Sequence, residues 1–154
     1  MTDKAKDNLV DWTVDYLKNK DLYLKRIEII EKNKKGFDIY VKFKDREQFF
    51  VVVPVIDDIN NVFSKFDSEK YFGLIVLNTK SNFDILVNNW EGFVKFKHLC
   101  VYFVNPSSKL DKKWIIYPHT HNNVCEKDAL EKGLNSMFGM VEELSESKIK
   151  DTFI

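Results

Sequence analysis

Asp38 is the residue in this sequence whose type and placement most directly suggest chemistry. It lies in the segment 37–44, where apolar and polar residues alternate with a period of two, so that Asp38, Tyr40 and Lys42 share one face of a predicted strand. A carboxylate on a strand face can bind a hard cation such as Mg²⁺, and a neighbouring lysine can orient a water molecule. Asp38 and Lys42 are therefore the candidate catalytic residues. Alternating charges are also an ordinary solvated strand surface.

A single carboxylate binds a divalent cation poorly, so a metal site at Asp38 needs partners. Glu28 lies on the preceding strand and can reach the same surface across the hairpin. Asp57 and Asp58 follow the third predicted strand, where loop residues often supply ligands. Capping of a short helix is an alternative role for this pair. The candidate Mg²⁺ ligands are Asp38, Glu28, Asp57 and Asp58.

A second candidate metal site is the cluster of His119, His121 and Cys125, which places donors suited to zinc within a short polar stretch. A structural zinc site usually has four ligands, and the sequence offers no evident fourth. We therefore expect no cofactor, apart from Mg²⁺ if the domain is an active nuclease.

Lysines gather around the first predicted hairpin and can contact phosphates. The candidate nucleic-acid-binding residues are Lys32, Lys34, Lys35 and Lys44. The chain as a whole has 24 basic and 24 acidic residues, which gives no overall attraction to a polyanion. DNA or RNA, a protein partner and a second copy of the chain all stay open as partners.

Several other classes of protein are not supported. The five glycines are scattered singly, so there is no P-loop or Gly-x-Gly-x-x-Gly, and there is no Gly-x-Ser-x-Gly elbow. The two cysteines do not suggest a disulfide framework, which favours the reducing cytoplasm. The longest apolar run, 49–56, is too short to span a bilayer, so we expect no membrane association.

The elements that position these residues follow from the hydrophobic periodicity. We expect one α/β domain over residues 1–144, with a mixed central sheet flanked by helices, and a frayed tail over 145–154. The predicted order is α-β-β-β-α-β-α-β-β-α, with helices at 4–20, 57–66, 81–96 and 126–144 and strands at 22–31, 37–44, 48–55, 71–78, 98–105 and 113–117. The strands on either side of the third helix should be parallel.

This order resembles that of the restriction-endonuclease-like, or PD-(D/E)XK, nuclease superfamily. The stretch 8–55 is similar to archaeal Holliday junction resolvases, with a leading helix, a strand, a strand opening Gly-Phe-Asp-Ile and a strongly apolar strand. The resemblance places Asp38 at the first metal carboxylate of the family. The Glu-x-Lys expected on the next strand is replaced by Val52-Val53-Pro54. Other mixed α/β folds stay open, including the C-terminal domain of tRNA-splicing endonucleases.

The resemblance and the missing motif together predict a catalytically degenerate nuclease-fold domain that acts by binding nucleic acid or a protein partner. One alternative is an active Mg²⁺-dependent endonuclease with relocated acidic residues, in which Lys42 replaces the missing lysine. Another is a structural or oligomerisation subunit, such as a homodimer.

Overall fold

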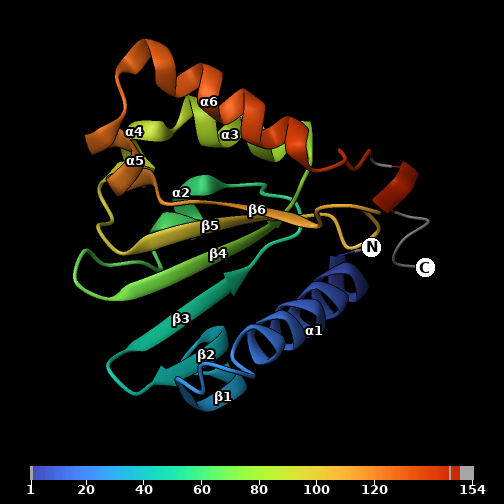
Figure 1. Ribbon diagram of the computed structural model, residues 1–154, viewed down its shortest axis with the longest axis vertical. Coiled ribbons are helices and arrows are strands. Elements are labelled where there is room, and N and C mark those ends of the chain that lie inside the picture. Colours follow the sequence, from blue (N-terminus) through green and yellow to red (C-terminus); the bar gives the residue numbers. More distant parts are fainter. Residues whose placement is uncertain (1, 146, 150–154) are drawn as a thin grey trace.

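A computed structural model describes residues 2–145 and 147–149. The chain forms a six-stranded sheet between two helical layers, with α1 alone on one face and α3 to α6 on the other (Figure 1). The strands are β1 Ile27–Lys34, β2 Phe37–Phe43, β3 Glu47–Val52, β4 Tyr71–Leu77, β5 Leu99–Val104 and β6 Lys113–Ile116. The helices are α1 Thr2–Lys20, α2 Ile59–Phe63, α3 Lys80–Asn88, α4 Trp90–Val94, α5 Pro118–Val124 and α6 Lys127–Met140.

The strands lie in the sheet in the same order as in the chain. The hairpin β1–β2 and the pair β2–β3 are antiparallel, β3–β4 and β4–β5 are parallel, and β5–β6 is antiparallel. The predicted α/β class and mixed sheet are confirmed, and so is the parallel pair around the third helix. The central position expected for the third strand is also confirmed, since five of the six residues of β3 are buried.

Several elements differ from the prediction. The first strand begins at Ile27 rather than at 22, because the chain leaves α1 through a turn in which Lys25 adopts a left-handed backbone conformation (φ 49°). The helix predicted at 81–96 is two helices, α3 and α4, separated at Asn89. The segment 118–123, predicted as a polar linker, is the short helix α5, which Pro118 begins at a position that needs no backbone N–H.

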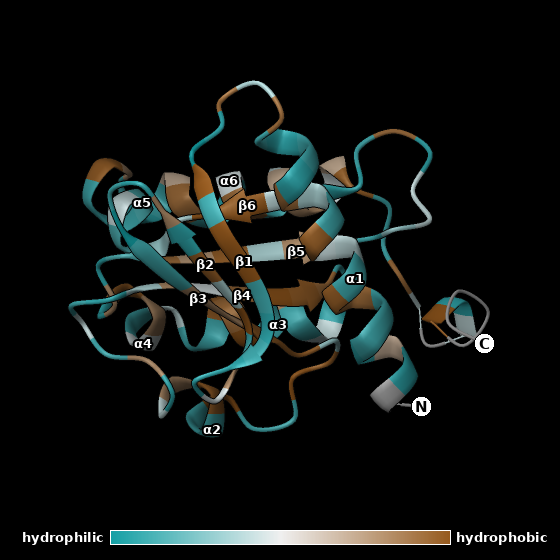
Figure 2. Ribbon diagram, turned by 90° about the horizontal axis from the view of Figure 1, so that it is seen from below, coloured by the Kyte–Doolittle hydropathy of each residue, from teal (hydrophilic) through white to brown (hydrophobic). Residues whose placement is uncertain are grey.

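Each face of the sheet has its own hydrophobic core, because side chains alternate along every strand. On one face, residues of β2 to β5 such as Ile39, Phe50 and Ile75 pack against Leu9 and Val14 of α1. In Figure 2, α1 carries alternating brown and teal segments, as expected of an amphipathic helix. The opposite core lies under the larger helical layer, and its buried members include Phe72, Phe83, Phe93, Phe103 and Trp114.

Buried asparagines close the sheet at the carboxyl ends of its parallel strands. The Asn78 side chain donates to the carbonyls of Val141 and Glu142 at 3.0 and 3.3 Å and accepts from Trp114 Nε1 at 2.8 Å. Asn105 donates to the same Glu142 carbonyl at 2.8 Å. The residues after α6 are thereby held across this end of the sheet.

The end of the chain differs from the prediction, because the segment after α6 is held against the sheet. The last helix, expected to run to 144, ends at Met140, and Leu144 is buried with its amide donating to the Asn78 carbonyl at 2.9 Å. The frayed tail was predicted to begin at Ser145, yet Ile149 is 3% exposed and packs in the α1 core. Residues 146 and 150–154 of that predicted tail lie outside the described residues.

None of the helices within residues 2–145 and 147–149 combines the length and the apolar character needed to cross a bilayer.

Candidate functional site

Asp38 lies at the start of β2, beside the end of β3, and both of its carboxylate oxygens have partners. Oδ2 accepts from the backbone N–H of Val52 at 2.7 Å, and Oδ1 lies 2.9 Å from Nζ of Lys6 on α1. The Asp38 side chain is only 15% exposed, whereas that of Lys6 is 43% exposed. The carboxylate therefore joins three elements of the fold, α1, β2 and β3.

The segment 52–54 lies next to Asp38, where the resemblance places the second metal ligand and the catalytic lysine. Val52 contributes only its backbone N–H there, and neither Val53 nor Pro54 has a side chain that can bind a cation or move a proton. The lysine ammonium of Lys6 occupies one carboxylate oxygen of Asp38. The donor set at this position fits a hydrogen-bonded ion pair better than a divalent cation.

Glu28 and Lys42 lie at the far end of the hairpin from Asp38. Glu28 pairs with Lys42 at 3.9 Å, close to the register pair of Ile29 and Lys42. Lys42 lies four positions after Asp38 along β2, a span of roughly 13 Å at the usual rise per strand residue. The structure therefore does not bring these three side chains together.

Asp57 and Asp58 follow β3 in an exposed segment. Asp58 is the N-cap of α2 and accepts from the backbone N–H of Asn60 at 3.0 Å, which is the capping role considered for this pair. Across the described residues, no three His, Cys, Asp or Glu side chains converge in a way that could hold a metal ion.

His119 and His121 lie in α5, and Cys125 is the C-cap of that helix. His119 Nδ1 lies 3.0 Å from the Val94 carbonyl, and His121 Nδ1 lies 3.0 Å from the Tyr117 carbonyl. These contacts join α5 to α4 and to the end of β6. The two histidines thus have local backbone partners and point to different neighbours.

The hairpin lysines predicted to bind nucleic acid mostly have carboxylate partners. Lys32 pairs with Asp11 of α1, Lys34 with Glu31 at 3.1 Å, and Lys35 with Glu47 at 3.7 Å. Lys44 is the member of the group for which no ion pair forms within the described residues. The surface of the hairpin is therefore nearly charge-balanced.

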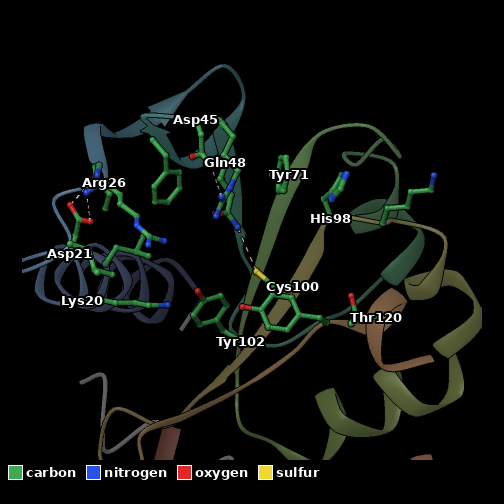
Figure 3. A pocket seen from close by; sticks show the side chains of 17 residues that line it. Lys20, Asp21, Arg26, Asp45, Gln48, Tyr71, His98, Cys100, Tyr102 and Thr120 are labelled. Atoms are coloured by element: carbon green, nitrogen blue, oxygen red, sulfur yellow. Dashed lines mark hydrogen bonds and ion pairs between the residues drawn. The ribbon is translucent and has the colours of Figure 1, made fainter. Parts of the chain in front are cut away.

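A pocket of about 310 Å³ lies at the end of the sheet opposite Asp38, and several cationic side chains line it (Figure 3). We call it the amino-end pocket, because it lies at the amino ends of β3, β4 and β5. Its principal lining residues are Lys20, Asp21, Arg26, Phe43, Arg46, Gln48, Tyr71, His98, Cys100, Tyr102 and Tyr117. Sequence reasoning missed it, since these residues come from six separate segments of the chain.

Strand register explains how the floor of the pocket forms. Gln48 pairs with Tyr71 across β3 and β4, and the Phe72 amide bonds the His98 carbonyl at 3.2 Å, so these side chains form a row. They share a sheet face with Cys100 of β5, the face that α1 covers farther along the strands. Because α1 ends at Lys20, this part of the face is left open.

Aromatic rings position the cationic wall. The Arg46 guanidinium lies 4.9 Å from the Phe43 ring centroid and 5.0 Å from that of Tyr71, and the Tyr71 ring stacks on His98 at 4.2 Å. Arginine–aromatic contacts of this kind hold a planar guanidinium in one orientation. Arg46 also lies 3.4 Å from the Asp45 carboxylate, at an exposed position.

Two further cations in the pocket are without an acidic partner. Among the described residues, no carboxylate lies within ion-pair distance of Lys20 or Arg26. The Asp21 carboxylate instead accepts the backbone N–H groups of Arg26 and Ile27 at 2.7 and 3.0 Å. This turn fixes the backbone that presents the Arg26 guanidinium.

The Cys100 thiol and the phenols of Tyr102 and Tyr117 stay neutral. Burial raises the pKa of the Cys100 thiol to about 12, and Gln48 Nε2 lies 3.5 Å from its sulfur. Burial likewise raises the pKa of Tyr102 and, together with the nearby Cys100, that of Tyr117. A neutral thiol is a poor nucleophile, so the pocket is suited to binding an anion rather than to covalent catalysis.

Comparison with known proteins gives no relative: no family model, no curated protein and no solved structure matches the chain.

Proposed function

We propose that this chain is a restriction-endonuclease-like domain that has lost cleavage activity and acts by binding. The observation that supports it best is the environment of Asp38. The carboxylate that the resemblance assigns to metal binding accepts the Val52 N–H and pairs with Lys6. An aspartate in this role stabilises the junction of α1, β2 and β3.

The element order supports the nuclease-like part of the proposal. A helix, three consecutive antiparallel strands and a following helix–strand unit form the first half of the chain. The start of β2 lies beside the end of β3, as the resemblance requires for a shared metal site. Fold likeness alone does not define an activity. The proposed loss of cleavage rests on the side chains around Asp38.

The chemistry of these side chains disfavours water activation. A metal-dependent nuclease lowers the pKa of a bound water and stabilises the charge that develops on the phosphate. With Val52 and Pro54 in place of the acid and the lysine, Asp38 has no second carboxylate to share a cation in the part of the chain that the structure describes. Relocation to Glu28 and Lys42 is disfavoured because both lie at the other end of the hairpin.

Binding is proposed to occur at the amino-end pocket rather than on the hairpin. Most hairpin lysines are neutralised by neighbouring carboxylates, whereas Lys20 and Arg26 face the pocket without such partners among the described residues. An anionic ligand gains most where positive charge is not already compensated.

The test measures thermal stability with and without millimolar Mn²⁺, for the wild type and for Asp38→Ala, together with cleavage of branched DNA, single-stranded DNA and RNA. A bound metal stabilises the folded state by about 2.7 kcal/mol at a hundred times its Kd. We expect no Mn²⁺-induced rise in Tm, no cleavage, and a lower Tm for Asp38→Ala.

Glu28→Ala is the matched control, since it removes a carboxylate from the same hairpin at an exposed ion pair. It should leave Tm almost unchanged. A Mn²⁺-dependent rise in Tm that Asp38→Ala abolishes, accompanied by cleavage, would show instead an active nuclease with relocated acids.

A further inference from the structure

We propose that the amino-end pocket binds one nucleotide unit, with its phosphate on Lys20 and Arg26 and its base against the Tyr71–His98 stack. This inference rests on the proposed function, because it names the ligand of a domain that acts by binding. It also separates the binding site from Asp38, which lies at the opposite end of β2.

The charge of the pocket selects an anion. Four cationic side chains line it against two carboxylates, and both carboxylates are engaged, Asp21 with backbone amides and Asp45 with Arg46. Figure 3 shows the Lys20 side chain directed toward Tyr102 on the floor. Arginine and lysine together are well suited to phosphate, which accepts several hydrogen bonds at once.

The aromatic rings of the pocket favour a ligand that carries a flat ring besides its anionic group. Tyr71 and His98 already stack, and His98 is exposed, so the stack can be extended by another flat ring. Tyr117, which is 48% exposed, lines the same pocket. Stacking of bases on aromatic side chains is the common means of holding nucleotides without reading their sequence.

The size of the pocket limits the ligand to a single unit. A volume of about 310 Å³ lies at the lower end of the usual range for small-molecule pockets, about 300 to 1,000 Å³. A duplex cannot enter such a space. The same nucleotide chemistry has two sources, a free nucleotide or the phosphorylated end of a single strand.

The experiment measures binding to the full chain by fluorescence anisotropy. The probes are a single-stranded oligonucleotide with a 5′-phosphate and a 3′-fluorophore, the same strand without the phosphate, and a labelled phosphotyrosyl peptide, with AMP as competitor. The variants are Arg26→Gln and Tyr71→Leu. Lys132→Gln on α6 is the matched control, because it removes one exposed positive charge outside the pocket.

We expect the phosphorylated strand or AMP to bind, Arg26→Gln to weaken binding about tenfold, and Tyr71→Leu to weaken it about fivefold or more. Lys132→Gln should bind as the wild type does. AMP that binds as tightly as the strand identifies a free nucleotide as ligand. A strand that binds at least about tenfold more tightly than AMP and needs its 5′-phosphate identifies a strand end.

The inference is overturned if neither the strand nor AMP binds, if Arg26→Gln and Lys132→Gln weaken binding equally, or if only the phosphotyrosyl peptide binds. These outcomes leave the proposed loss of cleavage intact, because that is decided by Mn²⁺ and Asp38. Cleavage of the strand in Mn²⁺ would overturn the proposed loss of activity while leaving nucleotide binding at the pocket in place.

Discussion

The two ends of the parallel strands differ in how their polar groups are used. At the carboxyl ends, Asp38, Asn78 and Asn82 are each bonded to backbone groups of other segments. At the amino ends, Lys20 and Arg26 line an open pocket, and no acidic partner of either lies within residues 2–145 and 147–149. Polar groups already bonded within the fold are unavailable for a ligand, so the amino ends are where side chains remain available to bind one.

This distribution is the reverse of what is usual in open α/β sheets, where ligands bind outside the carboxyl ends of the strands. Here the residues that follow α6 cross that end, and Leu144 is buried there. Helix α1, in turn, stops at Lys20 before it covers the amino ends. The lengths and end points of two segments therefore determine which end is open.

The largest effect is expected for Asn82→Ala, which breaks the closed end. Asn82 is fully buried, accepts from the Ile56 N–H at 2.9 Å, and donates to the Pro54 and Leu77 carbonyls at 2.8 and 2.9 Å. Loss of these bonds leaves buried backbone groups unsatisfied, so the free energy of unfolding should fall by about 3 kcal/mol. Chemical denaturation measures the change.

Asn135→Ala is the control for that substitution, since Asn135 is exposed and its side chain donates to the Glu131 carbonyl within α6. It should change the free energy of unfolding by less than about 0.5 kcal/mol. Equal effects of the two substitutions would show that the carboxyl end is not held by its buried asparagines.

The next effect concerns Asp38→Ala, which should lower the free energy of unfolding by about 2 kcal/mol, mainly because the Val52 N–H loses a charged acceptor. Lys6→Gln removes only the half-exposed ion pair and should cost about 0.5 kcal/mol. Urea denaturation of both variants separates the two contributions. A larger loss for Lys6→Gln than for Asp38→Ala would contradict this account.

The free energy of unfolding should depend on pH in the alkaline range, because Cys100 is buried at the amino ends of the strands. Its pKa rises from the ordinary 9.0 to about 12 on folding, so the folded state keeps a proton that the unfolded state loses. The stability from this thiol is complete below pH 9.0 and is lost as pH rises toward 12. Above pH 9.0 the wild type should lose about 1.4 kcal/mol per pH unit more than Cys100→Ala does.

Denaturation of the two proteins in reducing buffer over this pH range provides the measurement. Cys125→Ala is the control, since Cys125 is exposed and its removal should leave the wild-type pH dependence unchanged. Parallel pH profiles for the wild type and Cys100→Ala would show that the floor of the pocket is solvated rather than buried.

A modest effect on stability is expected for Asp21→Ala, which loosens the turn that presents Arg26. Two backbone N–H groups lose their acceptor at a partly exposed position, so the free energy of unfolding should fall by only about 1 kcal/mol. Affinity for the phosphorylated strand should fall as well, because Arg26 is no longer held in place. Unchanged affinity would separate the turn from the binding site.

Periodicity in the sequence was enough to predict most of the fold. The continuous apolar run of β3 predicted a buried central strand, as observed. The alternation in β2 predicted the strand, but its polar face is wrong in part, because Tyr40 is buried in the core with Phe49 and Phe72. Asp58 as a helix cap was likewise readable from local residue types. The break between α3 and α4 and the helix at Pro118 were missed, because short helices depend on packing more than on pattern.

The functional region was less predictable. Asp38 was found as a candidate, but its two partners come from α1 and from the backbone of β3, and a backbone donor leaves no mark in the sequence. The hairpin lysines were chosen by proximity in sequence, whereas the carboxylates that pair with Lys32 and Lys35 lie on α1 and β3. Charge balance on a surface depends on such long-range neighbours.

The sequence by itself determined the class of the fold, the strand order of the hairpin and the absence of the Glu-x-Lys acid and lysine beside Asp38, because these follow from local periodicity and residue type. The tertiary structure decided which polar groups are free. Register places Gln48, Tyr71 and His98 in one row, and the end of α1 at Lys20 leaves that row uncovered. Whether a side chain is bound to the fold or open to a ligand depends on segments distant in the chain, and only folding brings them together.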